Sequence, residues 1–357
     1  MKRFETLDGL RGVAALMVVI LHATQFFKAS WTPDNAYLAV DFFFCLSGFV
    51  IAHAYDARLL SKMTLANFAR RRFYRLYPMI FIGIVLGAIV VFIQVIVLRN
   101  LSVLNYVILV VSSLFILPSG LLFGMQAYPI NNPMWSLFFE SVANIAYAVA
   151  LKLKLRLKYA DYVVLFAMAG ALLAISLHYN GLELVGFSDF NSFLAGFVRV
   201  AFPFYSGVLI FRHADKFATT FHSYPVIYVA LIVMLIAPIH AMKGLYDYIS
   251  VVFAIPLLVY FGSKANVPQA GVWISEFLGR LSYPLYLVHQ PIIRILSHAY
   301  DAKFRNIVSP TIAMVIAILV SIGLAVLFLL MYDEPLRRVL SQKPKAAGLL
   351  NTSAGTP

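Results

Sequence analysis

Charged residues are scarce in this sequence of 357 residues: Asp, Glu, Lys and Arg make up 12% of it, against 62% for hydrophobic residues. A soluble domain carries roughly twice that share of charged residues, so the composition excludes a soluble protein. Cysteine is nearly absent, and the single Cys45 excludes an internal disulfide. No internal repeat is evident, which disfavours a transporter built from inverted repeats.

Long apolar runs take the place of the missing charge. A helix needs about 20 apolar residues to cross the hydrocarbon core of a bilayer, and runs near that length recur along the whole chain. They predict an all-α fold, a polytopic transmembrane helix bundle. We expect about ten spanning helices, at residues 12–29, 36–55, 77–98, 133–151, 159–179, 193–212, 222–241, 246–262, 279–299 and 309–332.

The charge balance is basic, with 28 Lys and Arg against 15 Asp and Glu, a net charge of +13. The basic residues cluster between apolar runs, so we interpret them as cytoplasmic loop charge and not as a nucleic-acid surface. Keeping every basic cluster on one side requires a further apolar run, at 103–117, to be re-entrant or interfacial. Both termini are then cytoplasmic, with an integral-membrane domain at 1–338 and a disordered cytoplasmic tail at 339–357.

The first apolar run carries two ionisable residues, Arg11 at its mouth and His22 well inside it. Such groups are costly in lipid and are functional candidates by default. Their spacing gives an angular offset of about 20° and a rise of roughly 16 Å on an α-helix, so both side chains face the same side. We expect Arg11 at the cytoplasmic mouth and His22 near mid-membrane. The alternative is that His22 hydrogen-bonds a neighbouring helix and Arg11 is an ordinary anchor.

A second candidate is the basic segment at residues 67–78, NFARRRFYRLYP. Arg72 and Arg75 are three residues apart and share one face of a helix. Guanidinium groups suit phosphate, to which they donate paired hydrogen bonds. The segment therefore predicts a phosphate-binding site, unless it only anchors the protein at the cytoplasmic surface.

Two carboxylates fall inside apolar runs, Glu140 and Asp41. A carboxylate in such a place is paired or functional. Either one could orient His22 and raise its basicity, as the third member of a catalytic triad does. Asp41 could instead face water at the outer end of its span.

Other polar and aromatic residues concentrate in two segments, 128–140 and 281–291. We expect them to bind an acceptor or to brace the bundle, and Trp135 could also be an interfacial belt residue. They are Asn132, Trp135, Ser282, Tyr286 and His289. No residue pattern predicts a metal site.

Six segments resemble, in order, the signature blocks of the acyltransferase 3 family. They are LDGLRGVAALMVVILHA, VDFFFCLSGFVI, RRFYRLYP, NPMWSLFFE, SYPLYLVHQP and EPLRR, and they run from Leu7 to Arg338. The family has an Arg-x10-His pattern in its first helix, which falls on Arg11 and His22. Its Arg-x-x-Arg pattern, in a cytoplasmic loop, falls on Arg72 and Arg75, and its ten core helices agree with the predicted spans.

The resemblance implies an enzyme of the bacterial inner (cytoplasmic) membrane, a multi-pass O-acyltransferase. It would move a short acyl group, acetyl above all, from cytoplasmic acyl-CoA to a hydroxyl of a cell-envelope or exported carbohydrate, which could be lipid-linked. Acyl-CoA is then a co-substrate, and no permanently bound cofactor is expected. Membrane lipids and proteins of polysaccharide assembly are the other expected partners. Many relatives carry a fused extracytoplasmic hydrolase-like domain that this sequence does not show.

In this hypothesis the donor's phosphates dock on Arg72, Arg75 and Arg11. His22 acts as general base on the acceptor hydroxyl, or carries the acyl group itself. Two alternatives stay open: a transporter or channel for an anionic solute, and a non-catalytic component of a polysaccharide assembly complex.

Overall fold

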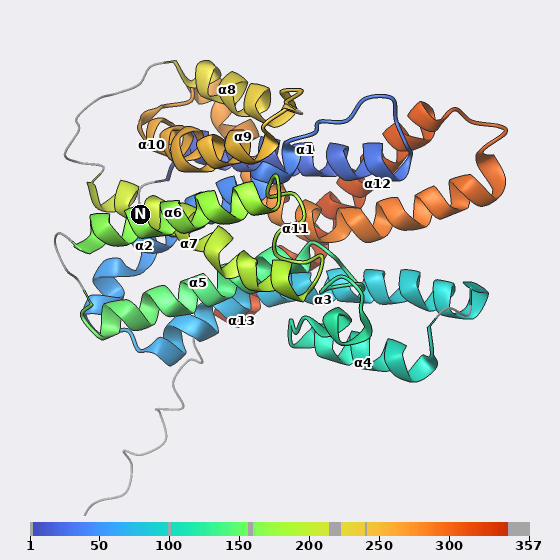
Figure 1. Ribbon diagram of the computed structural model, residues 1–357, viewed down its shortest axis with the longest axis horizontal. Coiled ribbons are helices and arrows are strands. Elements are labelled where there is room, and N and C mark those ends of the chain that lie inside the picture. Colours follow the sequence, from blue (N-terminus) through green and yellow to red (C-terminus); the bar gives the residue numbers. More distant parts are fainter. Residues whose placement is uncertain (1–2, 99–100, 156–159, 214–222, 240, 342–357) are drawn as a thin grey trace, which may run out of the picture.

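The computed structural model describes residues 3–98, 101–155, 160–213, 223–239 and 241–341. Within these residues the chain folds as a bundle of helices without β-strands, as predicted. The disordered tail expected at 339–357 falls almost entirely on residues 342–357, which lie outside the described part. Figure 1 shows most of the long helices running side by side along the longest axis of the molecule.

The described chain contains thirteen α-helices in sequence. Their bounds are α1 Glu5–Phe26, α2 Ala39–Leu60, α3 Leu65–Leu98, α4 Val103–Leu114, α5 Met134–Lys152, α6 Ala160–His178, α7 Phe190–His213, α8 Tyr224–Ile236, α9 Lys243–Ile249, α10 Ile255–Lys264, α11 Gln269–Ala299, α12 Pro310–Phe328 and α13 Glu334–Ser341. A π-helical turn at Ser250–Ala254 joins α9 to α10 in one apolar rod.

All ten predicted spans fall on helices, and eight helices of the described chain are long and apolar enough to cross a membrane. The other two predicted spans are α8, which has 13 residues, and α11, which has 31 residues but carries a glutamate, two arginines and two histidines along its length. The apolar run at 103–117 forms α4, whose 12 residues extend about 18 Å and fall short of a bilayer core. This agrees with a segment that does not span.

Helix α3 begins at Leu65, well before the span expected at 77–98, so the basic segment is helical and not a loop. The side chain of Thr64 caps this helix, since its Oγ1 accepts from the backbone N–H of Asn67 at 3.2 Å. Pro78 lies inside the helix and does not end it. Arg72 and Arg75 therefore lie on a helix, as their spacing predicts, although the family pattern describes this segment as a loop.

Two helix pairs form the centre of the bundle, α1 with α11 and α2 with α7. Small residues allow the close approach, which is the usual basis of helix packing in membranes. In α2 and α7 the contact is reciprocal: a Cβ on Gly48 would lie 1.9 Å from the backbone oxygen of Phe204, and one on Gly207 would lie 1.9 Å from that of Cys45. Cys45 is buried in this crossing and packs as a small apolar residue.

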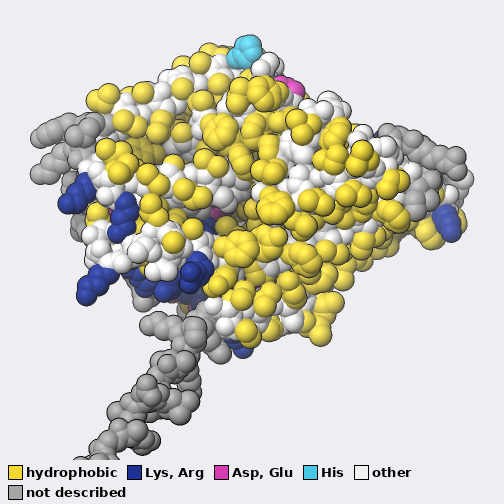
Figure 2. Space-filling model, turned by 90° about the horizontal axis from the view of Figure 1, so that it is seen from below, with side chains coloured by type: hydrophobic (Ala, Val, Ile, Leu, Met, Phe, Trp, Pro, Cys, Tyr) yellow, Lys and Arg dark blue, Asp and Glu magenta, His cyan; other side chains and the backbone are white. Residues whose placement is uncertain are grey.

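Charge and apolar surface separate on the outside of the bundle. Figure 2 shows a broad apolar surface across the middle of one face and most of its Lys and Arg side chains gathered at one end. That end holds the start of α3 and the C-terminal helix α13 (Figure 1). The arrangement is typical of a multi-pass membrane protein, and the cytoplasmic placement of the basic end stays a prediction.

Gly207→Val should destabilise the protein, because the added side chain collides with the backbone of α2 and cannot be relieved by a rotamer change. The expected loss in free energy of unfolding is about 1–3 kcal/mol, as for overpacked cores. Thermal unfolding of the purified protein in detergent would measure it. The matched control is Gly323→Val in α12, since a Cβ there meets nothing within 4 Å. Equal melting temperatures for the two variants would contradict the close crossing.

Candidate active site

Polar residues of the bundle line two separate cavities. The first, of ≈ 390 Å³, contains Arg11, Arg72, Arg75, Glu140 and Ser282, and is called here the arginine cavity. The second, of ≈ 350 Å³, contains His22, Asn132 and Trp135, and is called the histidine cavity. Arg11 and His22 share one face of α1, as predicted, but each belongs to a different cavity.

Six arginines line the arginine cavity and only two carboxylates do, Asp8 and Glu140. The arginines come from four helices and the chain's N-terminal segment: Arg3, Arg11, Arg72, Arg75, Arg280 and Arg337. Such an excess of guanidinium groups in one cavity favours an anionic ligand, and phosphate above all.

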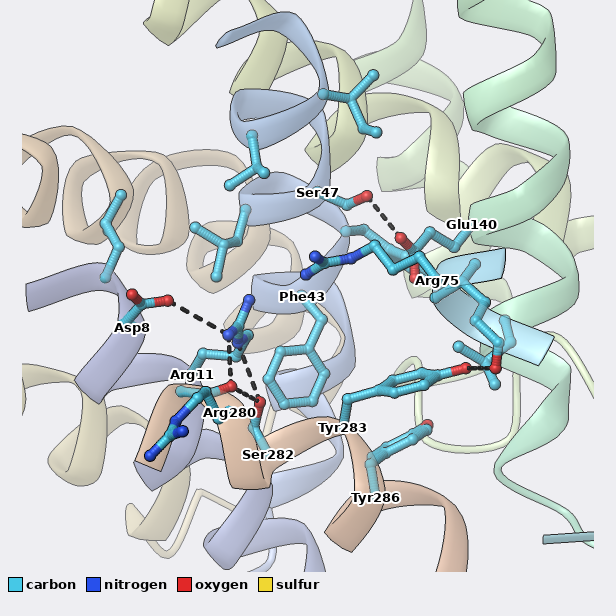
Figure 3. A pocket seen from close by; sticks show the side chains of 18 of the residues that line it. Asp8, Arg11, Phe43, Ser47, Arg75, Glu140, Arg280, Ser282, Tyr283 and Tyr286 are labelled. Carbon is cyan, nitrogen blue, oxygen red and sulfur yellow. Dashed lines mark hydrogen bonds and ion pairs between the residues drawn. The ribbon is translucent and has the colours of Figure 1, made fainter. Parts of the chain in front are cut away.

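Five of these arginines already have an acidic partner. Arg11 Nη2 lies 3.2 Å from Asp8 Oδ1 and also donates to the backbone oxygen of Gly279, while its Nε donates to Ser282 Oγ at 3.0 Å. Figure 3 shows this group of contacts between α1 and α11. The remaining pairs are Arg3 with Asp8 and Glu276, Arg72 with Glu140, Arg280 with Glu334 and Arg337 with Asp333.

Arg75 differs from the other five. Among the described residues it has no hydrogen-bond or ion-pair partner, and in Figure 3 its side chain extends from α3 into the cavity. Arg72 is half engaged, because its Nη2 bonds to Glu140 Oε1 at 2.9 Å while its buried Nε has no partner in this part of the chain. Both predicted phosphate ligands therefore keep donors available, and Arg75 keeps all of them.

Glu140 does not orient His22, so that prediction is wrong. Its carboxylate lies in the arginine cavity, where it accepts from Arg72 Nη2 and, at 2.7 Å, from Ser47 Oγ. Glu140 does not line the histidine cavity. It holds Arg72 in place instead.

Asp41 does not orient His22 either. It is fully buried and forms a two-point ion pair with Arg199, with Nε–Oδ1 at 3.0 Å and Nη2–Oδ2 at 2.7 Å. The other guanidinium nitrogen, Nη1, donates to the backbone oxygens of Leu182 and Val185 at 2.5 and 2.9 Å. The pair thus fastens the connection between α6 and α7 to the core. The alternative that Asp41 faces water is excluded by its burial.

His22 is paired with another histidine. Its Nδ1 lies 2.8 Å from Nε2 of His289, and the two rings are stacked with centroids 5.0 Å apart. His289 is fully buried, and its Nδ1 lies 3.0 Å from the backbone oxygen of Leu285. Sequence analysis named His289 only as an acceptor-binding or structural candidate, and the structure brings it into direct contact with the predicted base.

A thin partition separates the two cavities. Val40 and Tyr286 line both of them, and Tyr286 is held by a 2.8 Å hydrogen bond between its hydroxyl and Ser136 Oγ. The ring of Phe43 packs edge-on against Tyr286 with centroids 5.8 Å apart. The Tyr286 ring also lies 6.0 Å from that of His289. Val40 and Tyr286 therefore lie where the arginine cavity and the histidine cavity meet.

The remaining candidates divide between the two cavities. Ser282 bonds to Arg11 in the arginine cavity. Asn132 and Trp135 line the histidine cavity, where the backbone N–H of Asn132 donates to Gln290 Oε1 at 3.0 Å and Asn132 Oδ1 is buried without a partner among the described residues. Amides beside aromatic rings offer hydrogen bonds and flat apolar contact together. No group of three or more His, Cys, Asp or Glu in the described ranges is placed to hold a metal ion.

Sequence reasoning missed Arg199. It lies inside the predicted span 193–212, and its guanidinium is 5.0 Å from the ring of Trp135 as well as bound to Asp41. The cost of a charge in lipid signals that such an arginine has a partner inside the bundle. Asp41 is a second charge inside a span, and matching the two would have found the pair.

Comparison with known proteins gives a consistent family. The model of the family described as "Acyltransferase domain", the acyltransferase 3 family, matches residues 4–330. "Protein 2 in picA locus" of Rhizobium radiobacter is 42% identical over 159 residues, which are 41% of this chain and 82% of that protein. "Acyltransferase MdmB" of Streptomyces mycarofaciens is 37% identical over 99 residues, 25% of this chain and 24% of that enzyme. No solved structure matches.

The family match takes in the whole histidine cavity and most of the arginine cavity, from Arg11 through His22 and Arg75 to His289. It favours an enzyme over the two alternatives, a transporter and a non-catalytic component. Helices α1 and α3, which carry Arg11, His22 and Arg75, are among the eight helices of the described chain that are long and apolar enough to cross a membrane. The chain therefore belongs to the acyltransferase 3 family and is a multi-pass membrane acyltransferase.

Proposed function

We propose that this enzyme is an O-acyltransferase that takes a short acyl group, acetyl above all, from acyl-CoA in the arginine cavity. The acceptor is a hydroxyl of a cell-envelope or exported carbohydrate that enters the histidine cavity. The observation that carries the proposal is the pair of cavities, one rich in arginine and one holding His22, which meet at Val40 and Tyr286. The protein would lie in the bacterial inner membrane with the arginine cavity open to the cytoplasm.

Charge supports the assignment of the donor. Coenzyme A carries a pyrophosphate and a further phosphate. The arginine cavity offers Arg75, which has no partner among the described residues, and Arg72, whose Nε has none there either. The pantetheine arm is uncharged and narrow, so it suits a passage between Val40 and Tyr286. The rise from Arg11 to His22 on α1 is roughly 16 Å, a distance that the extended arm covers.

The side chains of the histidine cavity support its assignment as the site of the carbohydrate acceptor. The histidine cavity combines the rings of Trp135 and Phe187 with the amides of Asn132 and Gln290. Sugars bind well to this mixture, because their hydroxyls need hydrogen bonds and their ring faces pack on aromatic groups. A lipid-linked carbohydrate could reach the cavity from the outer leaflet, and proteins of polysaccharide assembly could deliver it.

The chemistry needs one base. His22 takes the proton of the acceptor hydroxyl as its oxygen attacks the thioester carbonyl carbon. The carbon–sulfur bond then breaks, and the departing thiolate of CoA receives the proton from His22. The products are the O-acyl ester and the free thiol of CoA, with no net proton change. Transient acylation of His22 would divide the same transfer into two steps.

His22→Gln should abolish acyl transfer, because the amide cannot accept a proton at neutral pH. The expected loss in kcat is about 10²-fold or more, the usual contribution of a positioned base. Incubating purified protein with labelled acetyl-CoA, succinyl-CoA and a glycan extract would measure transfer and identify the acyl group together. The control is Cys45→Ala, which should keep most activity because that buried thiol packs between α2 and α7. Transfer at the wild-type rate by His22→Gln would falsify the assignment of the base.

Arg75→Ala should raise the KM for acyl-CoA roughly ten-fold or more, since a charge-assisted hydrogen bond contributes about 1.5–3 kcal/mol and 1.4 kcal/mol is a factor of ten. The KM for the carbohydrate should stay unchanged. Lys at this position should restore binding only in part, because it lacks the planar fork. The matched control is Arg71→Ala, an exposed arginine of the same segment that does not line the cavity.

Arg72→Ala should raise the donor KM as well, and it also leaves Glu140 without its charged partner. A loss of membrane abundance should therefore accompany it, which Arg75→Ala should not show. If both alanine variants bind acyl-CoA as the wild type does, the phosphates dock elsewhere.

A further inference from the structure

The contact between His22 and His289 determines which nitrogen of each ring carries its proton. A backbone carbonyl oxygen can only accept, so the 3.0 Å contact with Leu285 requires a proton on Nδ1 of His289. In a neutral ring the other nitrogen, Nε2, is then an acceptor. The 2.8 Å contact is completed by a proton on Nδ1 of His22. His22 is left with the lone pair on its Nε2.

The free nitrogen is the one that a general base needs. His22 lines the histidine cavity, and its Nε2 has no hydrogen-bond partner among the described residues. The side-chain hydrogen bond that His22 makes within the described residues therefore uses Nδ1. The two hydrogen bonds run from the backbone oxygen of Leu285 through His289 to His22. They leave Nε2 of His22 unprotonated, on a ring that borders the histidine cavity.

We propose that His289 is the positioning residue of His22, holding it in the tautomer whose Nε2 is free to accept the substrate's proton. The inference rests on the proposed function, in which His22 is the base. His289 takes the place that a buried carboxylate has in a catalytic triad. When His22 gains a proton, the lone pair on Nε2 of His289 still accepts from its Nδ1–H and stabilises the imidazolium.

The surroundings of His289 are rigid, as this role requires. The side chain is fully buried in α11. Pro291 lacks an N–H, so the backbone oxygen of Leu287 has no partner from that residue, and Asn131 Nδ2 donates to it at 2.9 Å. This contact fastens α11 to the segment before α5 within one turn of His289. A neutral partner also suits this place, since a carboxylate would add a buried charge inside the bundle.

A purely structural role for His289 predicts a different outcome from substitution. His289→Leu keeps the apolar packing but removes the acceptor, and His289→Gln keeps an acceptor oxygen near the position of Nε2. Under our proposal, Leu lowers kcat by about ten-fold or more with both KM values unchanged, and Gln restores a measurable part of that loss. The control is His298→Leu, an exposed histidine of the same helix that lines neither cavity.

The tautomer can be measured without any activity. Nitrogen NMR of protein labelled with 15N-histidine distinguishes protonated Nδ1 from protonated Nε2, and comparison with His22→Gln assigns the signal of His22. We expect the Nδ1–H form in the wild type and in His289→Gln, and a mixture of both forms in His289→Leu.

The two readouts separate failure of this inference from failure of the proposed function. Finding the Nε2–H form of His22 in the wild type, or an unchanged kcat in a well-folded His289→Leu, overturns the role of His289. If no acyl-CoA and no glycan is turned over by the wild type, the proposed function fails, and the NMR result still decides whether His289 sets the tautomer.

Discussion

The contact between α1 and α11 is the constraint on which both cavities depend. At one end Arg11 donates to the backbone oxygen of Gly279 and to Ser282, and at the other end His22 bonds to His289. Arg11 and His22 are eleven residues apart on α1, and Gly279 and His289 are ten apart on α11, so the two pairs span nearly the same rise of roughly 15–16 Å. The two helices therefore run in the same direction, and both contacts fit one relative position along their axes. A shift by one residue would break both sets of hydrogen bonds at once. The helix pair therefore fixes the separation between the arginine cavity and the proposed base.

The sequence was sufficient for features that depend on composition along one segment. Apolar length placed the spans, and the 12 residues of α4 agree with a segment that does not cross. Helical spacing put Arg11 and His22 on one face. The span was expected to begin at residue 77 because only apolar length was counted, whereas α3 begins at Leu65. Nothing between Leu65 and Pro78 breaks a helix, and Thr64 caps it. A basic segment at a membrane surface can be helical as easily as irregular.

Pairings between distant segments could not be predicted in the same way. Glu140 and Asp41 were both sensible partners for His22 by residue type, yet each lies beside an arginine, Arg72 and Arg199 respectively. Inside a bundle an ionised carboxylate gains far more from a guanidinium than from a neutral imidazole. The imidazole is then left for a neutral partner, and His289 meets that condition. Treating the intramembrane charges as a set to be balanced would have removed both carboxylates from the candidates.

The partition at Tyr286 has an electrical consequence. In the proposed reaction the uncharged pantetheine arm brings the acyl group past this ring, while the phosphates stay with the arginines. The acyl group replaces the hydrogen of the acceptor hydroxyl, and His22 passes that proton to the CoA thiolate, so the exchange moves no net charge past the ring. Moving one elementary charge through a whole membrane exchanges about 2.3 kcal/mol per 100 mV, but an acyl group is neutral. Transfer past Tyr286 then draws nothing from the membrane potential and is not opposed by it. By the proposed reaction, a cell could acylate molecules on the far side of its membrane at a rate that does not depend on the membrane potential.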